Sequence, residues 1–218
     1  MPVFYYLIRV LIILTSRILF RSVALHKERL PKKTGYLVCM NHSSYIDPLH
    51  IMAHQTRPVH YLAKIELFKH WFLRWFFTNM LQIPVDRKKG DNKEAWAKAI
   101  DTLKGGGIIG IFPEGTTKHV GHRELMKGHT GVARLALLAK VPVVPAGIAN
   151  NTDILRRKKK VRGLVKQYFV IGHPIYFREY YGKDEDKEVL RELTDKIMAR
   201  VEELIIEGEE YKKEHSWF

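Results

Sequence analysis

The chain has 218 residues, enough to bury a hydrophobic core, and it contains no linker or low-complexity tract that would divide it. Its formal net charge of +14 favours anionic partners such as nucleic acid, lipid headgroups or phosphorylated ligands, without choosing among them. The single cysteine, Cys39, excludes an internal disulfide. Because it lies in an apolar run, we expect a buried, unreactive thiol.

The first segment, from Val3 to Phe20, is almost entirely apolar and aromatic. On a helix, its polar residues Arg9, Ser16 and Arg17, together with Arg21, fall within a sector of roughly 140°, which leaves a wide apolar face. This pattern favours a helix that lies in the membrane interface over one that crosses the bilayer. A terminal helix packed into the core is the alternative. No small-residue cleavage site follows, so we do not expect a removable signal peptide.

Strands and helices alternate along the rest of the chain. Apolar runs predict strands at residues 36–40, 58–63, 108–112, 141–148 and 167–171. Helical patterns lie at about 47–53, 66–81, 92–103, 130–139 and 189–205. This order predicts an α/β fold with a largely parallel or mixed sheet covered by helices. We therefore divide the chain into a membrane-associating helical segment, residues 1–30, and an α/β domain, residues 31–218.

The predicted helix at residues 66–81 is aromatic on nearly every side and also carries Lys69, His70 and Arg74. Such a helix suits the boundary between lipid headgroups and acyl chains at least as well as a protein core. It is also placed to supply the apolar groove that a long acyl chain needs.

Two polar loops, residues 41–48 and 113–118, each follow a predicted strand. Ligands of open α/β sheets bind at the carboxyl ends of the strands, so the two loops can form one site. In the first loop, Asp47 follows His42 by five residues. If the chain turns between them, the carboxylate can hold the imidazole in the tautomer that takes a proton from a hydroxyl. Helix capping by Asp47 and Pro48 explains the same residues without chemistry.

The string Asn-His-Ser-Ser-Tyr-Ile-Asp-Pro at residues 41–48 resembles the first block of the glycerolipid acyltransferases, with its His-x4-Asp motif. Three further blocks follow in the family's order, Ile-Pro-Val-Asp-Arg at 83–87, Phe-Pro-Glu-Gly-Thr at 112–116 and Val-Pro-Val-Val-Pro at 141–145. The resemblance covers about residues 36–150 and is strongest to the bacterial 1-acylglycerol-3-phosphate acyltransferases.

This resemblance implies transfer of a fatty acyl group from acyl-CoA or acyl-carrier protein to the 2-hydroxyl of 1-acylglycerol-3-phosphate. The product would be phosphatidic acid, made for phospholipid biosynthesis at the cytoplasmic face of the inner membrane. The expected partners are therefore lysophosphatidic acid, an acyl thioester, an anionic membrane surface and acyl-carrier protein. An acyltransferase for another lysolipid or a glycolipid is the alternative within the class. A basic, non-enzymatic polyanion-binding protein is the alternative outside it, although no nucleic-acid-binding motif is present.

The resemblance also implies roles for single residues. His42 is the general base and Asp47 orients it, while the acceptor-binding blocks contribute Arg87, Glu114, Gly115 and Thr116. The planar guanidinium of Arg87 suits a phosphate, and a surface ion pair is its alternative. We assign Glu114 to the glycerol hydroxyl or to holding a basic neighbour.

One departure from the family concerns the residue after Glu-Gly-Thr, which is usually arginine but is Thr117 here, followed by Lys118. Either Lys118 supplies the missing charge, or Arg87 and Lys64 contact the phosphate. Lys64 also resembles a family position near the histidine. We expect its ammonium to stabilise the oxyanion or the phosphate, and a solvated lysine at a strand end is the alternative.

The dense basic run at residues 156–162 could contact anionic lipid, the phosphates of coenzyme A or solvent, and lipid is the favoured interpretation. We expect no metal and no bound cofactor. No Cys/His cluster has the spacing of metal ligands, and the glycine run at residues 105–107 precedes its strand instead of forming a phosphate-binding loop after it.

Overall fold

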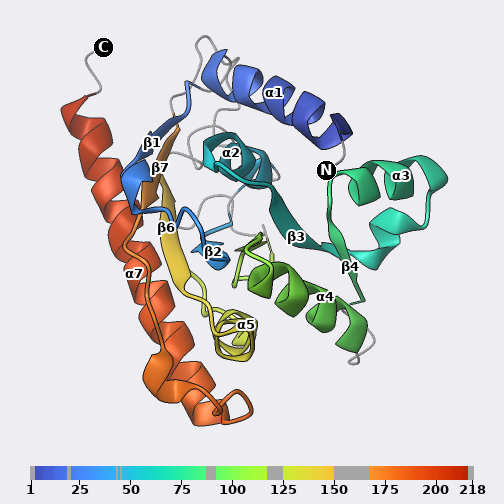
Figure 1. Ribbon diagram of the computed structural model, residues 1–218. Helices are drawn as coiled ribbons and strands as arrows, with labels where there is room; N and C mark the ends of the chain where they lie inside the picture. Colours follow the sequence, from blue (N-terminus) through green and yellow to red (C-terminus); the bar gives the residue numbers. More distant parts are fainter. Residues whose placement is uncertain are drawn as a thin grey trace.

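The computed structural model describes residues 3–18, 21–42, 44, 46–86, 92–116, 125–149 and 167–215. Its centre is a seven-stranded sheet in the order β1-β7-β6-β2-β5-β3-β4 (Figure 1). The strands are β1 (Val23–Leu25), β2 (Tyr36–Met40), β3 (Val59–Lys64), β4 (Ile83–Val85), β5 (Ile108–Ile111), β6 (Val143–Ala149) and β7 (Tyr168–Ile171). Neighbouring strands are parallel, except that β7 is antiparallel to β6. The predicted α/β fold with a largely parallel, mixed sheet is confirmed.

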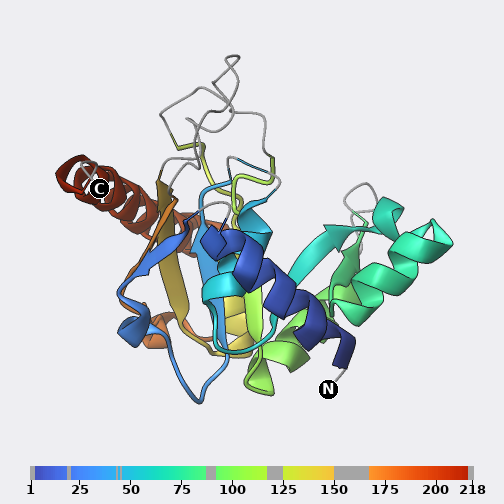
Figure 2. The same ribbon diagram turned by 90° about the horizontal axis from the view of Figure 1, so that it is seen from above.

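Helices cover both faces of this sheet. The α-helices of the described residues are α1 (Val3–Ile18), α2 (Asp47–His54), α3 (Trp71–Asn79), α4 (Lys93–Lys104), α5 (Gly131–Ala139) and α7 (Lys187–Glu214). Short 3₁₀ turns are η1 (Lys27–Arg29), η2 (Ile65–Phe68) and η3 (Arg178–Tyr180). One buried cluster joins the sheet to α4, α5 and α7, and a second joins its other face to α1 and α2. Figure 2 shows α3 beyond the edge formed by β3 and β4.

The central strands are buried because helices lie on both sides of them. Every residue of β2, β6 and β7 is buried, which is why these segments are continuous apolar runs. Cys39 is fully buried, as expected, and burial also raises the pKa of its thiol. Helix α7 lies directly on β6 at Gly147, where a Cβ atom would come within 2.5 Å of the Leu204 and Ile205 backbone.

Two elements differ from those predicted from the sequence. Strand β1 lies inside the expected helical segment 1–30 and pairs with β7 at the edge of the sheet. A strand of three residues is too short for its hydrophobic pattern to be recognised. The predicted helix at residues 66–81 is divided into η2 and α3, and Lys69 and His70 lie between them.

Helix α1 packs on the domain through a side that includes Arg9 and Ser16, and it exposes many apolar side chains. The buried residues are Tyr5, Ile12 and Ser16. The Arg9 guanidinium donates to the carbonyls of Met52, at 3.3 Å, and Gln55, at the C-terminal end of α2. The large apolar side chains exposed on α1 are Val3, Tyr6, Leu7, Val10, Leu11, Leu14 and Ile18. Within the described ranges, none of the helices has the length and hydropathy needed to span a bilayer.

Two buried histidines on α2 lead us to expect a fold whose stability depends on pH. Burial lowers the pKa of His50 to about 4 and that of His54 to about 3, from an ordinary value of 6.5. The unfolded chain therefore binds protons at a pH at which both folded rings remain neutral. We expect the free energy of unfolding to fall as the pH drops from 6.5 towards 4, with a loss of about 2 kcal/mol per ring by about pH 5. Equilibrium urea unfolding at a series of pH values measures this loss.

Two variants separate this effect from general acid sensitivity. His54→Gln keeps a polar side chain near the Ser22 hydroxyl, which lies 2.7 Å from Nε2 of His54, and should remove about half of the pH-dependent loss. His173→Gln, at an exposed position, should leave the loss unchanged. A pH dependence in His54→Gln equal to that of the wild type would contradict the assignment.

Candidate active site

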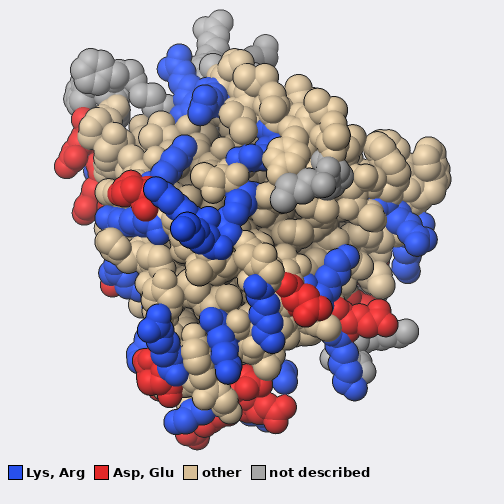
Figure 3. All heavy atoms as spheres, in the orientation of Figure 1, with Lys and Arg blue, Asp and Glu red and all other residues tan. Residues whose placement is uncertain are grey.

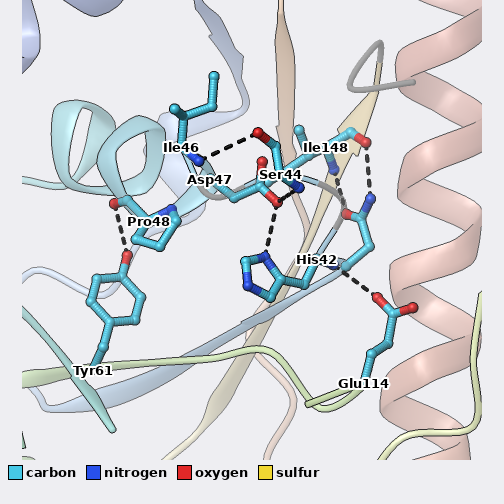
Figure 4. Close-up of polar contacts among 9 residues, drawn as sticks. His42, Ser44, Ile46, Asp47, Pro48, Tyr61, Glu114 and Ile148 are labelled. Carbon is cyan, nitrogen blue, oxygen red and sulfur yellow. Dashed lines mark hydrogen bonds and ion pairs between the residues drawn. The ribbon is translucent and has the colours of Figure 1, made fainter. Parts of the chain in front are cut away.

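The imidazole of His42 and the carboxylate of Asp47 form a hydrogen-bonded pair at the carboxyl end of β2 (Figure 4). Nδ1 of His42 lies 3.1 Å from Oδ2 of Asp47. The Asp47 side chain is fully buried, and that of His42 is 16% exposed. When Nδ1 donates to this carboxylate, Nε2 on the other side of the ring is the nitrogen that can accept a proton. The predicted approach of the two side chains is confirmed.

The chain turns back between β2 and α2 because Asp47 also holds the backbone. Its Oδ2 accepts from the backbone N–H of Ser44 at 2.8 Å, and its own N–H donates to the Ser44 carbonyl at 3.1 Å. Asp47 is the first residue of α2, so the expectation that it is the N-cap is wrong, and Ile46 occupies that position. Side chains on a helix lean towards its N-terminus, which directs the carboxylate over the preceding turn and onto His42.

Glu114 joins the loop after β5 to the backbone of His42. Its Oε1 accepts from the His42 N–H at 2.8 Å, and its Oε2 accepts from the Met126 N–H at 3.3 Å. The next residue, Gly115, has a φ of 67°, in the left-handed region that favours glycine. The family resemblance led us to expect Glu114 among the acceptor-binding residues. In the structure the buried carboxylate holds the turn that carries the imidazole, a role that the spacing did not indicate.

Asn41 ties the same turn to β6. Its Nδ2 donates to the Ile148 carbonyl at 3.1 Å, and its Oδ1 accepts from the Ile148 N–H at 2.8 Å. The side chain is buried, so these two bonds satisfy polar groups that water does not reach. The sequence analysis identified Asn41 only as the first residue of the 41–48 block, since nothing in the local pattern pairs it with a residue more than a hundred positions away.

Two aromatic rings pack in series behind the imidazole. The Phe112 ring stacks on His42 with centroids 4.0 Å apart, and Tyr61 stacks on Phe112 at 5.9 Å. The Tyr61 hydroxyl donates to the Pro48 carbonyl at 3.0 Å. Gly110 leaves room for this arrangement, because a Cβ atom there would lie 2.1 Å from the Tyr61 ring. Ring packing and the hydrogen bond at Nδ1 together set the orientation of the imidazole.

The other predicted site residues fall into two groups. Lys64 is exposed at the carboxyl end of β3, and Gly115 and Thr116 are partly buried in the loop after β5. All three lie at the same edge of the sheet as His42, because β2, β3 and β5 are parallel and their carboxyl ends meet there. Arg87 and Lys118 lie outside the described residues, as do Thr117 and the basic run at 156–162.

Known proteins resemble this chain in sequence and in structure. A family model described as Acyltransferase matches residues 22–149, more than half of the chain. A 1-acyl-sn-glycerol-3-phosphate acyltransferase of Bacillus subtilis is 28% identical over 186 residues, which covers 82% of this chain and 85% of that relative. A protein of the same name from Borreliella burgdorferi is 26% identical over 180 residues and covers 82% and 71% of the two chains.

A solved structure shares the fold. The crystal structure of a 1-acyl-sn-glycerophosphate acyltransferase from Thermotoga maritima superimposes with a TM-score of 0.68 at 21% sequence identity. The match covers 91% of this chain and 80% of that chain, so the likeness extends beyond the strands that carry the site.

Replacing Glu114 by glutamine tests whether its carboxylate holds the turn. Glutamine has the same size but only one acceptor oxygen for the two N–H groups of His42 and Met126, so one buried donor loses its partner. We expect the free energy of unfolding to fall by about 1–3 kcal/mol in urea denaturation. Glu185→Gln, at an 88% exposed side chain, is the matched control and should change it by less than about 0.5 kcal/mol. Equal stability of the two variants would show that the carboxylate is dispensable.

Proposed function

The chain belongs to the acyltransferase family, and from this premise we propose that it transfers a fatty acyl group from an acyl thioester to the 2-hydroxyl of 1-acyl-sn-glycerol-3-phosphate. The acyl donor is acyl-CoA or acyl-carrier protein, and the product is phosphatidic acid for phospholipid biosynthesis. The names of the relatives that match 82% of the chain support this acceptor. The observation that carries the proposal is the His42–Asp47 pair, held against the Glu114 loop (Figure 4).

The reaction begins with proton transfer from the acceptor hydroxyl to Nε2 of His42. The hydroxyl oxygen attacks the thioester carbonyl carbon, a C–O bond forms, and the carbonyl electron pair moves onto oxygen. The tetrahedral intermediate then breaks its C–S bond, and the leaving thiolate takes the proton from the imidazolium. Asp47 stabilises the imidazolium between these two steps. No acyl-enzyme is needed, because the acceptor itself is the nucleophile.

Two negative charges need partners in this reaction, the oxyanion and the phosphate of the acceptor. Lys64 is the cation proposed for one of them, since this exposed residue ends β3 at the same edge of the sheet as His42. Arg87 and Lys118 are the further cations proposed for the phosphate, and Gly115 and Thr116 complete the acceptor loop. Glu114 acts as a positioning residue, because its oxygens hold backbone amides.

An acyl-transfer assay tests the reaction and the base together. With labelled oleoyl-CoA and 1-oleoyl-glycerol-3-phosphate, the purified protein should form phosphatidic acid. His42→Ala should lower turnover by about 10²–10⁴-fold, because general base catalysis is lost, with an unchanged melting temperature. Lys64→Met should also lower turnover severely without unfolding the protein, because the ammonium group proposed for the oxyanion or the phosphate is lost. His173→Gln is the matched control and should have wild-type activity.

Two results separate the mechanism from the substrate. Full activity of His42→Ala would overturn the proposed base whatever the substrate. A panel of lysolipids and glycolipids in the same assay tests the acceptor. Acylation of another acceptor in preference to 1-oleoyl-glycerol-3-phosphate would replace the proposed substrate and leave the family unchanged.

We further propose that the enzyme works on the cytoplasmic face of the cell membrane, with α1 and α3 in the interface. Besides the exposed apolar face of α1, α3 exposes Trp71 (76%), Phe72 (47%) and Trp75 (49%). Phe4 joins the two helices, since its ring centroid lies 4.8 Å from that of Trp75. This continuous apolar and aromatic surface supports binding to the boundary between headgroups and acyl chains, where lysolipid and product reside.

Removing apolar side chains from this surface should weaken membrane binding without unfolding the protein. For Leu14→Ser combined with Trp71→Ser, we expect at least about a 10-fold loss of affinity for vesicles of phosphatidylglycerol and phosphatidylcholine, measured by sedimentation. Ile206→Ser is the control, because Ile206 is an exposed apolar residue of α7. Vesicle binding by the double variant as strong as that of the control would exclude α1 and α3 as the membrane surface.

A further inference from the structure

A second concave site lies at the opposite edge of the sheet, where β2, β5 and β6 begin. We call this cavity of about 620 Å³ the basic pocket. Its walls are the chain before β2, the turn between α4 and β5, the turn between α5 and β6, and residues 176–181. Its charged lining residues are Lys33, Lys104, Lys140 and Arg178, and none of the described Asp or Glu residues lines it.

The basic pocket is separate from the acyl-transfer site. Gly35 lines the pocket immediately before β2 begins, and His42 follows the other end of the same strand. The six steps from Tyr36 to His42 cover about 20 Å at about 3.3 Å per residue. Every residue of β2 is buried, so packed side chains fill the space between the two sites. The proposed reaction therefore makes no use of the basic pocket.

The positive charges in the basic pocket have no carboxylate partner among the described residues. Its four cations make no ion pair with any carboxylate in the described part of the chain. Two of them lie over tyrosine rings that also line the pocket, Lys140 at 5.8 Å from the Tyr181 ring and Arg178 at 5.3 Å from the Tyr176 ring. These contacts position the cations and leave their charge available. Figure 3 shows Lys and Arg side chains gathered across the middle of the face that lies at the amino ends of the strands.

The walls of the basic pocket are held in place by Arg57. Its Nη2 donates to the carbonyls of Pro31, at 2.7 Å, and Thr34, at 2.8 Å, and its Nη1 donates to the carbonyl of Gly106. One guanidinium thus joins the segment that carries Lys33 to the turn that follows Lys104. A site whose walls are fixed before binding loses less entropy when a ligand enters.

Lys140 occupies a backbone position that lysine rarely takes. It ends α5 with a φ of 55°, in the left-handed conformation for which glycine and asparagine are the usual residues. The chain therefore places a cation in the pocket lining where glycine or asparagine would fit with less strain.

Four cations without a carboxylate partner among the described residues thus surround a preformed cavity. We infer that the basic pocket binds a multiply charged phosphate ester. Its phosphates lie among the lysines and Arg178, whose guanidinium can bind phosphate oxygens in pairs. Its less polar part packs against Tyr176 and Tyr181. The volume falls in the range of about 300–1,000 Å³ that small-molecule sites occupy, and a nucleoside diphosphate fits this chemistry. The phosphate ester can belong to a soluble nucleotide or to a lipid headgroup.

The test measures binding to the full-length protein with its pocket charges removed. Lys33→Gln, Lys104→Gln and Lys140→Asn are combined, and asparagine keeps the left-handed backbone accessible at position 140. Lys98→Gln, Lys187→Gln and Lys196→Gln, all at exposed positions outside the pocket, form the matched control with the same net charge. Calorimetry with ADP in the presence of EDTA reports the soluble ligand, and sedimentation with phosphatidic acid vesicles reports the lipid headgroup.

We expect the wild-type protein and the control to bind ADP, and the pocket variant to bind ADP at least about 10-fold more weakly. The melting temperature and the rate of acyl transfer of the pocket variant should be unchanged. A selective loss of vesicle binding in the pocket variant would identify the phosphate of a lipid headgroup as the ligand. The inference is overturned if the pocket variant and the control bind equally in both arms, or if the wild type binds neither ADP nor the vesicles.

Discussion

The position of the His42 imidazole depends on how the buried turn after β2 satisfies its backbone hydrogen-bonding groups. The Glu114 carboxylate accepts from the His42 N–H, and the Asp47 carboxylate accepts from the Ser44 N–H. A buried N–H without a partner costs about 1–3 kcal/mol, so each of these bonds restricts the turn to one conformation. The same Asp47 oxygen that accepts from Ser44 also faces Nδ1 of the imidazole. The same carboxylate therefore holds the turn and orients the imidazole.

Parallel pairing of β2, β3 and β5 explains why one edge of the sheet carries the His42–Asp47 pair and the other carries the basic pocket. The carboxyl ends of these strands deliver His42, Lys64 and Glu114 to one edge. Their amino ends, together with that of β6, meet at the opposite edge, where Lys33 and Lys140 gather. Because every residue of β2 and β6 is buried, packed side chains separate the two edges.

Helix α1 shows how a surface suited to lipid can coexist with a stable fold. The buried Tyr5 hydroxyl accepts from the Val59 N–H at 3.1 Å, and Arg9 holds the carbonyls at the end of α2. These polar contacts fix the helix to the domain, so its apolar side does not need to turn inward. The apolar side then continues into the aromatic residues of α3 through the contact between Phe4 and Trp75.

The sequence alone was sufficient for the alternation of strands and helices and for the α/β class, because these follow from apolar periodicity. The pairing of His42 with Asp47 was expected from the resemblance of the whole 41–48 block to a family motif, since the spacing alone also fitted helix capping. Only the tertiary structure decided that Glu114 holds the His42 backbone, that Asn41 pairs with Ile148 and that a basic pocket forms at the amino ends of the strands. Each of these arrangements joins residues from separate segments. Their proximity comes from the order of strands in the sheet, which hydrophobic patterns do not encode, because every buried strand of a parallel sheet has the same apolar character.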